Sequence, residues 1–383
     1  MGETRTIGTI LAALETIAPL PLAEPWDNVG LLLGDRGKPL AGPVFLTIDL
    51  TEASLDEAKR AGAGLIIAYH PTIFHPLKRI TTDDPKGRTL VGVIESGIPV
   101  YSPHTALDAA DGGVTDWLCE MLAPQGADLP SHGDRRALQP CAVSDPNATH
   151  KIVTFVPQDH AERVRDGLAS VGAGRIGAYS NCSFTTQGEG TFLGDEGTTP
   201  MIGKAGALES APEVRLEMVI AEGAIPLAME ILRALHPYEE PACDLIPLAP
   251  KPRRTVGAGR RIHLDQPMTP KQLAANLKAN LGVDAVKIAC AGDNPVSTVG
   301  VCPGAGGSLI DSAIADGCTL FVTGEVSHHE ALGAIQRGCS ILLAGHTNTE
   351  RGYLPSYAEQ IKAQVAGVEV ITSKVDGPVF STV

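Results

Sequence analysis

Short apolar runs constrain the fold of this chain more than any other feature of its sequence. They lack the alternation of apolar and polar residues that marks a strand with one solvent-exposed face. A strand that is apolar along its whole length belongs in a sheet covered on both faces, as parallel strands usually are. Three such runs lie near the N-terminus, with helical patterns between them: VFLTIDL (44–50), LIIAYH (65–70) and IPVYSPH (98–104). This order predicts βαβ units around a buried parallel sheet.

The same order of strands and helices returns near the C-terminus. Apolar strands are predicted at 297–302, 319–324 and 340–346, and helices follow them near 307–316, 328–337 and 349–365. The chain is therefore predicted to be an α/β protein whose core is built from two related α/β halves.

The middle of the chain has a different pattern of predicted strands and helices. Strands are predicted at 151–157, 214–220 and 243–248, with helices at 159–170 and 224–235, and a Gly-rich span covers 187–206. This two-fold β-α-β pattern predicts an inserted ferredoxin-like α+β domain. The predicted organisation begins with an N-terminal core half (1–125) and a polar linker (126–145). The inserted domain (146–252) and a C-terminal core half (253–383) follow.

Charge and cysteine usage narrow the class of protein. A formal net charge of −14 disfavours nucleic acid as a partner, because such binding rests on basic contacts to phosphates. The eight cysteines form no CxxC pair, which argues against a zinc ribbon or a thioredoxin motif. Neither a signal peptide nor an apolar run long enough to span a membrane is recognisable. We therefore expect a cytoplasmic protein without a membrane partner.

Candidate metal ligands follow three of the predicted strands. His70 ends the second run, His104 and Asp108 follow the third in HTALD, and His346 and Glu350 follow SILLAG in GHTNTERG. Ligands of open parallel sheets bind beyond the carboxyl ends of the strands, so these side chains are expected to converge. Residues four apart on a helix also face the same way, which applies to both His–carboxylate pairs. A shell of histidine and carboxylate suits zinc, manganese or iron.

Each of these residues has a structural alternative. A histidine at a strand end beside a proline is more often a hydrogen-bonded structural residue than a ligand. Asp108 can instead cap a helix near residue 113, and Glu350 can complement a helix N-terminus. The adjacent pair His328 and His329 begins a predicted helix and is a candidate for the same pocket, although neighbours on a helix face different sides.

Two other features are weaker. The segment CPGAGGS (302–308) matches neither the phosphate-binding loop nor the dinucleotide fingerprint, so a tight turn between strand and helix is the better interpretation. No serine or cysteine stands in a recognisable nucleophile motif.

Six blocks of the sequence together resemble a known family. They resemble, in order, the signature blocks of the NIF-three-like family, whose members are also described as dinuclear-metal-centre hexameric proteins and are often labelled GTP cyclohydrolase I type 2 homologue. The middle segment looks like the PII/CutA-like insert of the longer members. The blocks are EPWDNVGLLLG (24–34), IIAYHPTIFHPLKRI (66–80), YSPHTALDAADGGV (101–114), CPGAGGSLI (302–310), TGEVSHHEAL (323–332) and GHTNTERGYLP (345–355).

The resemblance implies a homohexamer with one or two divalent metal ions per chain. Carried over residue by residue, it implies the metal ligands His70, Asp108, His346 and Glu350, with Glu350 as the bridging group. The sequence departs from the family pattern at the first histidine of the His-His pair, where Tyr69 stands. A neutral phenol is a poor metal ligand, which puts one metal position in question and makes His104 a possible substitute or supporting residue.

Two functions remain open from the sequence. The first is a metal-dependent hydrolase of the GTP cyclohydrolase kind, which acts on a nucleotide or another anionic small molecule. The second is a non-catalytic metal-binding or regulatory hexamer, in which the inserted domain acts as a sensor or a gate. Metal ligands alone do not decide between them.

Overall fold

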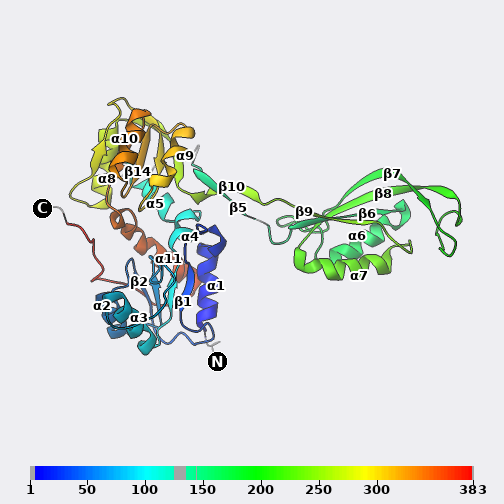
Figure 1. The fold of residues 1–383 in the computed structure, drawn as a ribbon, viewed down its shortest axis with the longest axis horizontal. Coiled ribbons are helices and arrows are strands. Elements are labelled where there is room, and N and C mark those ends of the chain that lie inside the picture. The colour runs from blue at the N-terminus through cyan, green and yellow to red at the C-terminus, as the bar shows by residue number, and fades with distance from the viewer. Residues whose placement is uncertain (1–4, 125–134, 144, 382–383) are drawn as a thin grey trace. The chain divides into compact units, whose positions relative to one another are not determined.

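The protein is a mixed α/β protein with several sheets (Figure 1). Its computed structural model describes residues 5–124, 135–143 and 145–381. The chain separates into two compact units, Met1–Cys141 with Arg253–Val383 (the core unit) and Ala142–Pro252 (the insert unit). Part of the predicted linker, 126–134 and 144, lies outside the described residues. Strand β5 (Gln139–Val143) lies in the remainder and pairs with β10 (Lys251–Ala258) in a two-stranded sheet.

The first sheet of the core unit contains the three N-terminal runs. Its order is β1-β4-β3-β2-β16, and β2, β3 and β4 pair in parallel as their apolar sequences predict. Helix α3 begins four residues before the predicted helix at 89, since Asp84 caps it and Pro85 occupies its first turn. The elements of this region are α1 (Ile7–Ile17), β1 (Gly30–Leu33), β2 (Val44–Thr47), α2 (Glu52–Arg60), β3 (Leu65–Ala68), α3 (Pro85–Ser96), β4 (Val100–Ser102), α4 (His104–Ala109) and α5 (Val114–Glu120).

The end of the chain completes this first sheet. Strand β16 (Val370–Thr372) pairs in parallel with β2, and α11 (Leu354–Gln364) contacts both strands and α1. The two halves of the core are thus interleaved, whereas the sequence predicts two separate halves. The predicted helix from 349 was also too long, because two 3₁₀ turns, Thr347–Thr349 and Arg351–Tyr353, precede α11.

The second sheet of the core unit contains the C-terminal runs. Its order is β11-β13-β14-β15-β12, with the three central strands parallel and both edge strands antiparallel. Its elements are β11 (Arg260–Met268), α8 (Pro270–Leu281), β12 (Lys287–Ala289), β13 (Val296–Val301), α9 (Ile310–Ala315), β14 (Leu320–Thr323), α10 (His328–Gln336) and β15 (Ser340–Leu343).

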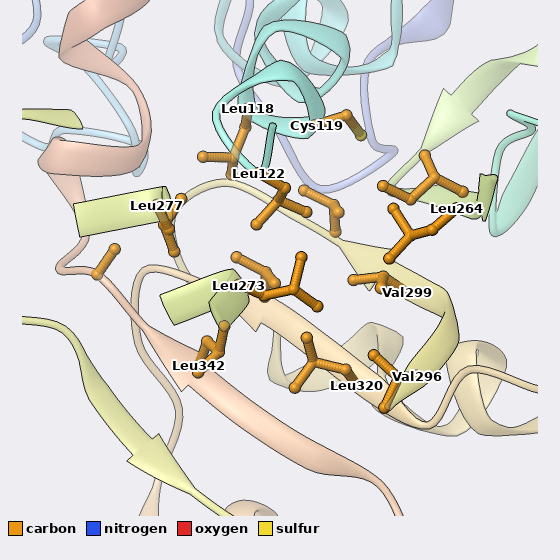
Figure 2. Close-up of a cluster of buried hydrophobic side chains, with 14 residues drawn as sticks. Leu118, Cys119, Leu122, Leu264, Leu273, Leu277, Val296, Val299, Leu320 and Leu342 are labelled. Atoms are coloured by element: carbon orange, nitrogen blue, oxygen red, sulfur yellow. The ribbon is translucent and has the colours of Figure 1, made fainter. Parts of the chain in front are cut away.

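A hydrophobic cluster joins the two halves of the core unit (Figure 2). Leu118 and Leu122, in and just after α5, pack with Leu273 and Leu277 of α8 over the second sheet. Helix α5 belongs to the N-terminal half of the sequence, yet it covers the sheet of the C-terminal half. Burial of each such leucine stabilises the fold by about 1.5–3 kcal/mol.

The insert unit is an antiparallel sheet of order β7-β8-β6-β9 with two helices. The even-numbered residues of β8 from Val214 to Ile220 are buried in a cluster with residues of both helices. Strand β7 occupies part of the span that was predicted only as Gly-rich. The elements are β6 (His150–Val156), α6 (Ala161–Ser170), β7 (Phe184–Leu193), β8 (Leu208–Ile220), α7 (Ile225–Leu235) and β9 (Cys243–Pro247). Across the described part of both units, no helix is long and apolar enough to cross a membrane.

His236 makes the stability of the insert unit depend on pH. It is 7% exposed, its Nδ1 accepts a hydrogen bond from the Tyr238 N–H (3.1 Å), and its Nε2–H therefore donates to the Phe155 carbonyl (3.0 Å). This arrangement requires a neutral ring, and burial lowers the pKa of His236 below its ordinary 6.5. The unfolded chain consequently binds a proton first as the pH falls, so the unit is expected to lose stability below about pH 6.5.

Urea unfolding of the full chain at pH 7.5 and pH 5.5 tests this expectation. His236→Asn keeps an acceptor near Tyr238 but cannot titrate, so it should reduce the loss of stability between the two pH values. An identical loss in the variant would show that other groups are responsible.

Candidate metal centre

Three side chains from the two sheets of the core unit come together. His70 follows β3 of the first sheet, whereas His346 and Glu350 lie between β15 of the second sheet and α11. Each can offer one ligand atom such that all three atoms lie within 4.8 Å of one another. Glu350 lies between the two 3₁₀ turns and not, as predicted, in the first turn of a helix. The expected convergence of strand-end residues is therefore present for these three.

Glu350 lies between the two histidines. Its Oε2 is 3.4 Å from His70 Nε2, and its Oε1 is 3.4 Å from His346 Nε2. The side chain is only 3% exposed. Within the described part of the chain, His70 Nε2 and Glu350 Oε2 are both buried without a hydrogen-bond partner. Buried polar atoms are normally satisfied, so such a pair indicates a missing partner.

Each histidine also contacts a second carboxylate, through the ring nitrogen that faces away from Glu350. His70 Nδ1 lies 2.9 Å from Asp49 Oδ1, and His346 Nδ1 lies 2.9 Å from Glu325 Oε1. Both rings therefore present Nε2 to Glu350. A carboxylate on the far nitrogen is the usual support of a metal-binding histidine. Asp49 was not among the predicted site residues, yet it lies two residues beyond the end of β2 and so at another strand end of the same sheet.

The carboxylates also set the charge of His70. Burial opposes protonation, but Asp49 and Glu350 prevail and raise the pKa of His70 to about 10. Burial likewise works against ionisation of Asp49, yet the hydrogen bond with His70 keeps the pKa of Asp49 below its ordinary value. Without a metal ion, His70 and Asp49 therefore form an ion pair through His70 Nδ1, and a cation at His70 Nε2 must replace the proton there.

Asp108 lies close to this triad but outside it. Its Oδ1 accepts a hydrogen bond from the Tyr69 hydroxyl (2.5 Å), and Tyr69 is 2% exposed. Burial raises the pKa of Asp108 to about 7. Burial, together with the charges of Asp108 and Glu350, holds the pKa of Tyr69 well above its ordinary 10. Tyr69 thus stays a neutral phenol that occupies one oxygen of Asp108.

His104 is held by a carboxylate that the sequence analysis missed. Its Nδ1 lies 2.8 Å from both oxygens of Asp27, and Asp27 also accepts hydrogen bonds from the backbone N–H and the hydroxyl of Thr105. His104 has a φ of +29°, which is strained for a residue with a side chain. The ring lies 5.4 Å from the ring of His70, centroid to centroid. His104 is therefore fixed beside the triad.

His328 and His329 do not belong to the triad. Both are exposed at the start of α10, and their rings contact each other at 5.5 Å. Ser327 caps this helix with Glu330, which explains the local sequence without a functional role.

A comparison with known proteins shows to which family this chain belongs. The model of the family described as Duf34/NIF3 (NGG1p interacting factor 3) matches residues 5–378. The chain belongs to the Duf34/NIF3 family. The resemblance drawn from the six sequence blocks is thereby confirmed.

Similar members of the Duf34/NIF3 family cover nearly the whole chain. A protein of Halalkalibacterium halodurans named GTP cyclohydrolase 1 type 2 homolog is 35% identical over 97% of this chain and 98% of its own length. A Bacillus subtilis protein of the same name is also 35% identical, over 97% of each chain. A crystal structure of a Bacillus cereus protein related to NIF3 superposes with a TM-score of 0.71 at 34% identity and covers all of both chains.

Proposed function

We propose that His70, His346 and Glu350 bind one divalent metal ion per chain. The two buried, unpartnered atoms that face each other, His70 Nε2 and Glu350 Oε2, carry this proposal. Two imidazole nitrogens and a carboxylate suit zinc, manganese or iron. A second ion would need Asp108, but Tyr69 already donates to one of its oxygens. Of the one or two ions per chain that the family resemblance implies, this favours one.

Gly304 supports the proposed centre. A Cβ at this position would lie 2.7 Å from Glu350 Oε1 and 3.2 Å from His346 Nε2, and φ is +62°. Gly304→Ala should therefore displace two ligand side chains and lower the affinity for Zn²⁺ by at least about tenfold, as perturbed support of a metal site does. Competition with a chromogenic chelator measures this affinity.

Gly282→Ala is the matched control for Gly304. Gly282 has a φ of +65° but nothing within 4 Å of the added Cβ. Both substitutions carry a similar backbone cost of about 1–2 kcal/mol, and only Gly304→Ala should weaken metal binding. Equal affinities in the two variants would remove Gly304 from the site.

We propose further that the protein is a metal-dependent hydrolase of a nucleotide or another anionic small molecule. A bound divalent ion would supply Lewis-acid chemistry and offset negative charge on the substrate. His104 is the residue best placed to move a proton: when neutral, its Nδ1–H donates to Asp27, which leaves Nε2 as the accepting atom. Glu325 fixes His346, and Asp49 fixes His70. The relatives named GTP cyclohydrolase 1 type 2 homolog support this choice of reaction.

A nucleotide panel tests the enzymatic proposal. Metal-loaded protein should turn over at least one member, chelation should abolish the turnover, and added metal should restore it. His104→Gln should lower kcat by about 100-fold or more, the usual contribution of a general acid or base, without changing metal content. Metal-loaded protein that turns over no member of the panel would contradict the proposal.

A regulatory function is the second candidate function of the protein, and a feature of the insert unit supports it. Its open face holds a cavity of about 980 Å³, lined by strands β6, β7 and β8 and by residues that include Tyr238 and Glu239. We propose that this unit is the ferredoxin-like, PII/CutA-like insert of the longer family members and acts as a sensor. Deletion of 146–252 should then change metal or metabolite affinity. Unchanged affinity would argue against this role.

We also propose that the chains assemble into a homohexamer in the cytoplasm, as the family resemblance implies. Native mass spectrometry should show six chains. A monomer at micromolar concentration would contradict the assembly.

A further inference from the structure

Three aromatic rings form a corner beside the proposed metal centre. Trp26 and Phe74 lie 5.9 Å apart with their planes at 60°. His104 lies 6.3 Å from each of them, at 75° to Trp26 and 78° to Phe74. Each pair is in the tilted or edge-to-face geometry that aromatic side chains prefer. The three residues come from separate segments of the first 110 residues and are here called the aromatic corner.

Hydrogen bonds fix the loops that carry this corner. Asp27, next to Trp26, is bound by His104 and Thr105 as described above. The side-chain amide of Asn28 donates to the Ile73 carbonyl, next to Phe74 (2.5 Å). The positions of Trp26 and Phe74 are thus set relative to each other and to His104. A ring that binds here would meet a surface that is already ordered, which lowers the entropic cost of binding.

Trp26 exposes a large apolar surface. Its side chain is 60% exposed, although the loop that holds it is tightly anchored. Ligand sites are commonly lined by aromatic side chains with a few fixed polar groups beside them, and this is the setting of Trp26. The other tryptophan, Trp117, packs against Tyr353, so the contrast lies within one chain.

The aromatic corner is continuous with the metal triad. The His104 ring lies 5.4 Å from His70, and the His70 ring lies 5.5 Å from His346. All three rings are partly exposed. A ligand whose flat ring rests on Trp26 can therefore reach the triad with a second group.

We infer that the aromatic corner binds the planar aromatic ring of the ligand, while an anionic group of the same ligand faces His70 and His346. This inference deepens the proposed function and rests on it for the anionic group. Trp26 supplies the stacking face, and Phe74 and His104 hold the edge of the ring. The ligand class is accordingly a heteroaromatic compound joined to a phosphate or carboxylate by a short linker, such as a nucleoside monophosphate.

Tryptophan fluorescence tests the inference directly. The sequence contains two tryptophans, so Trp117→Phe leaves Trp26 as the single reporter. In the metal-loaded Trp117→Phe protein, AMP should quench the emission saturably, whereas ribose 5-phosphate, which lacks the ring, should not quench it. Trp26→Ala should weaken AMP binding, measured by calorimetry, by about five- to hundredfold, the range found for base–aromatic stacking. Its affinity for ribose 5-phosphate should stay unchanged.

Two controls separate this inference from the metal proposal. Phe380→Ala removes another exposed aromatic side chain, 85% exposed, and should leave AMP binding unaltered. Adenosine, titrated into the Glu350→Gln variant, reports ring binding without the triad. Suppose that the protein binds metal, but that Trp26→Ala and the unaltered protein bind AMP with equal affinity. This result would overturn the aromatic corner alone. If the unaltered protein binds no metal but adenosine still quenches Trp26, the aromatic corner is supported and the metal centre is overturned.

Discussion

Glu350→Gln is expected to lower the affinity for Zn²⁺ or Mn²⁺ by more than about 100-fold, beyond the 10–100-fold that loss of a supporting residue usually causes. The substitution preserves the size of the side chain but removes the charge between two histidine Nε2 atoms, each 3.4 Å away. Thermal unfolding of the metal-free variant should show a folded protein, because the substituted side chain stays similar in shape. Titration calorimetry of metal into metal-free protein measures the effect.

Glu325→Gln provides the control for this prediction. Glu325 supports His346 through Nδ1 and is 54% exposed, so its loss should weaken metal binding by only about 10–100-fold. If Glu325→Gln weakened binding as much as Glu350→Gln, Glu350 would not be a ligand.

The second large effect is expected at Arg260, which is fully buried in the core unit. Its guanidinium donates to both oxygens of Asp116 and to the carbonyls of Gly257, Gly259, Ala109 and Ala110. It therefore ties β11 to α5 and to the C-terminal end of α4. Arg260→Met leaves Asp116 as a buried charge and should lower the free energy of unfolding by about 3–5 kcal/mol. Urea denaturation measures this loss.

Two further variants show whether burial is the cause. Arg88→Met breaks an exposed ion pair with Glu52 and should leave the urea midpoint nearly unchanged, because solvent screens exposed pairs. Removal of both partners, by Arg260→Met with Asp116→Leu, should restore part of the stability, since no unpaired charge then remains. Arg135, 3.3 Å from Asp116, moderates the effect of the single variant. An unchanged urea midpoint for Arg260→Met would contradict this account.

Features of the fold that depend on uninterrupted apolar runs could be predicted from the sequence. Strands β2, β3 and β4 and their parallel pairing were predicted because a fully apolar run has one stable environment, a sheet covered on both faces. His70 and His346 were recognised as candidate ligands because they follow such strands.

Features that depend on contacts distant in the sequence were not predictable from pattern alone. Strand β16 is three residues long and only partly buried, so it gives little periodic signal, yet Val370 pairs with Val44 at the start of the chain and completes the first sheet. Glu350 was assigned to a helix, because a 3₁₀ turn has nearly the same pattern over so few residues. Asp27 was missed because its partner His104 lies 77 positions away.

The pairing of Tyr69 with Asp108 is the most informative of these differences. The sequence showed only that a tyrosine stands where the family has a histidine. The structure shows that the phenol donates to Asp108, which in turn lies outside the triad of His70, His346 and Glu350. The proposed single ion follows from this contact.

The central claim is tested most directly by elemental analysis of the full chain, purified without chelators, beside the Glu350→Gln variant. We predict close to one divalent ion per chain in the unaltered protein and almost none in the variant. Two ions per chain would contradict the role assigned to Tyr69. No ion in either protein, or the same content in both, would contradict the metal centre itself.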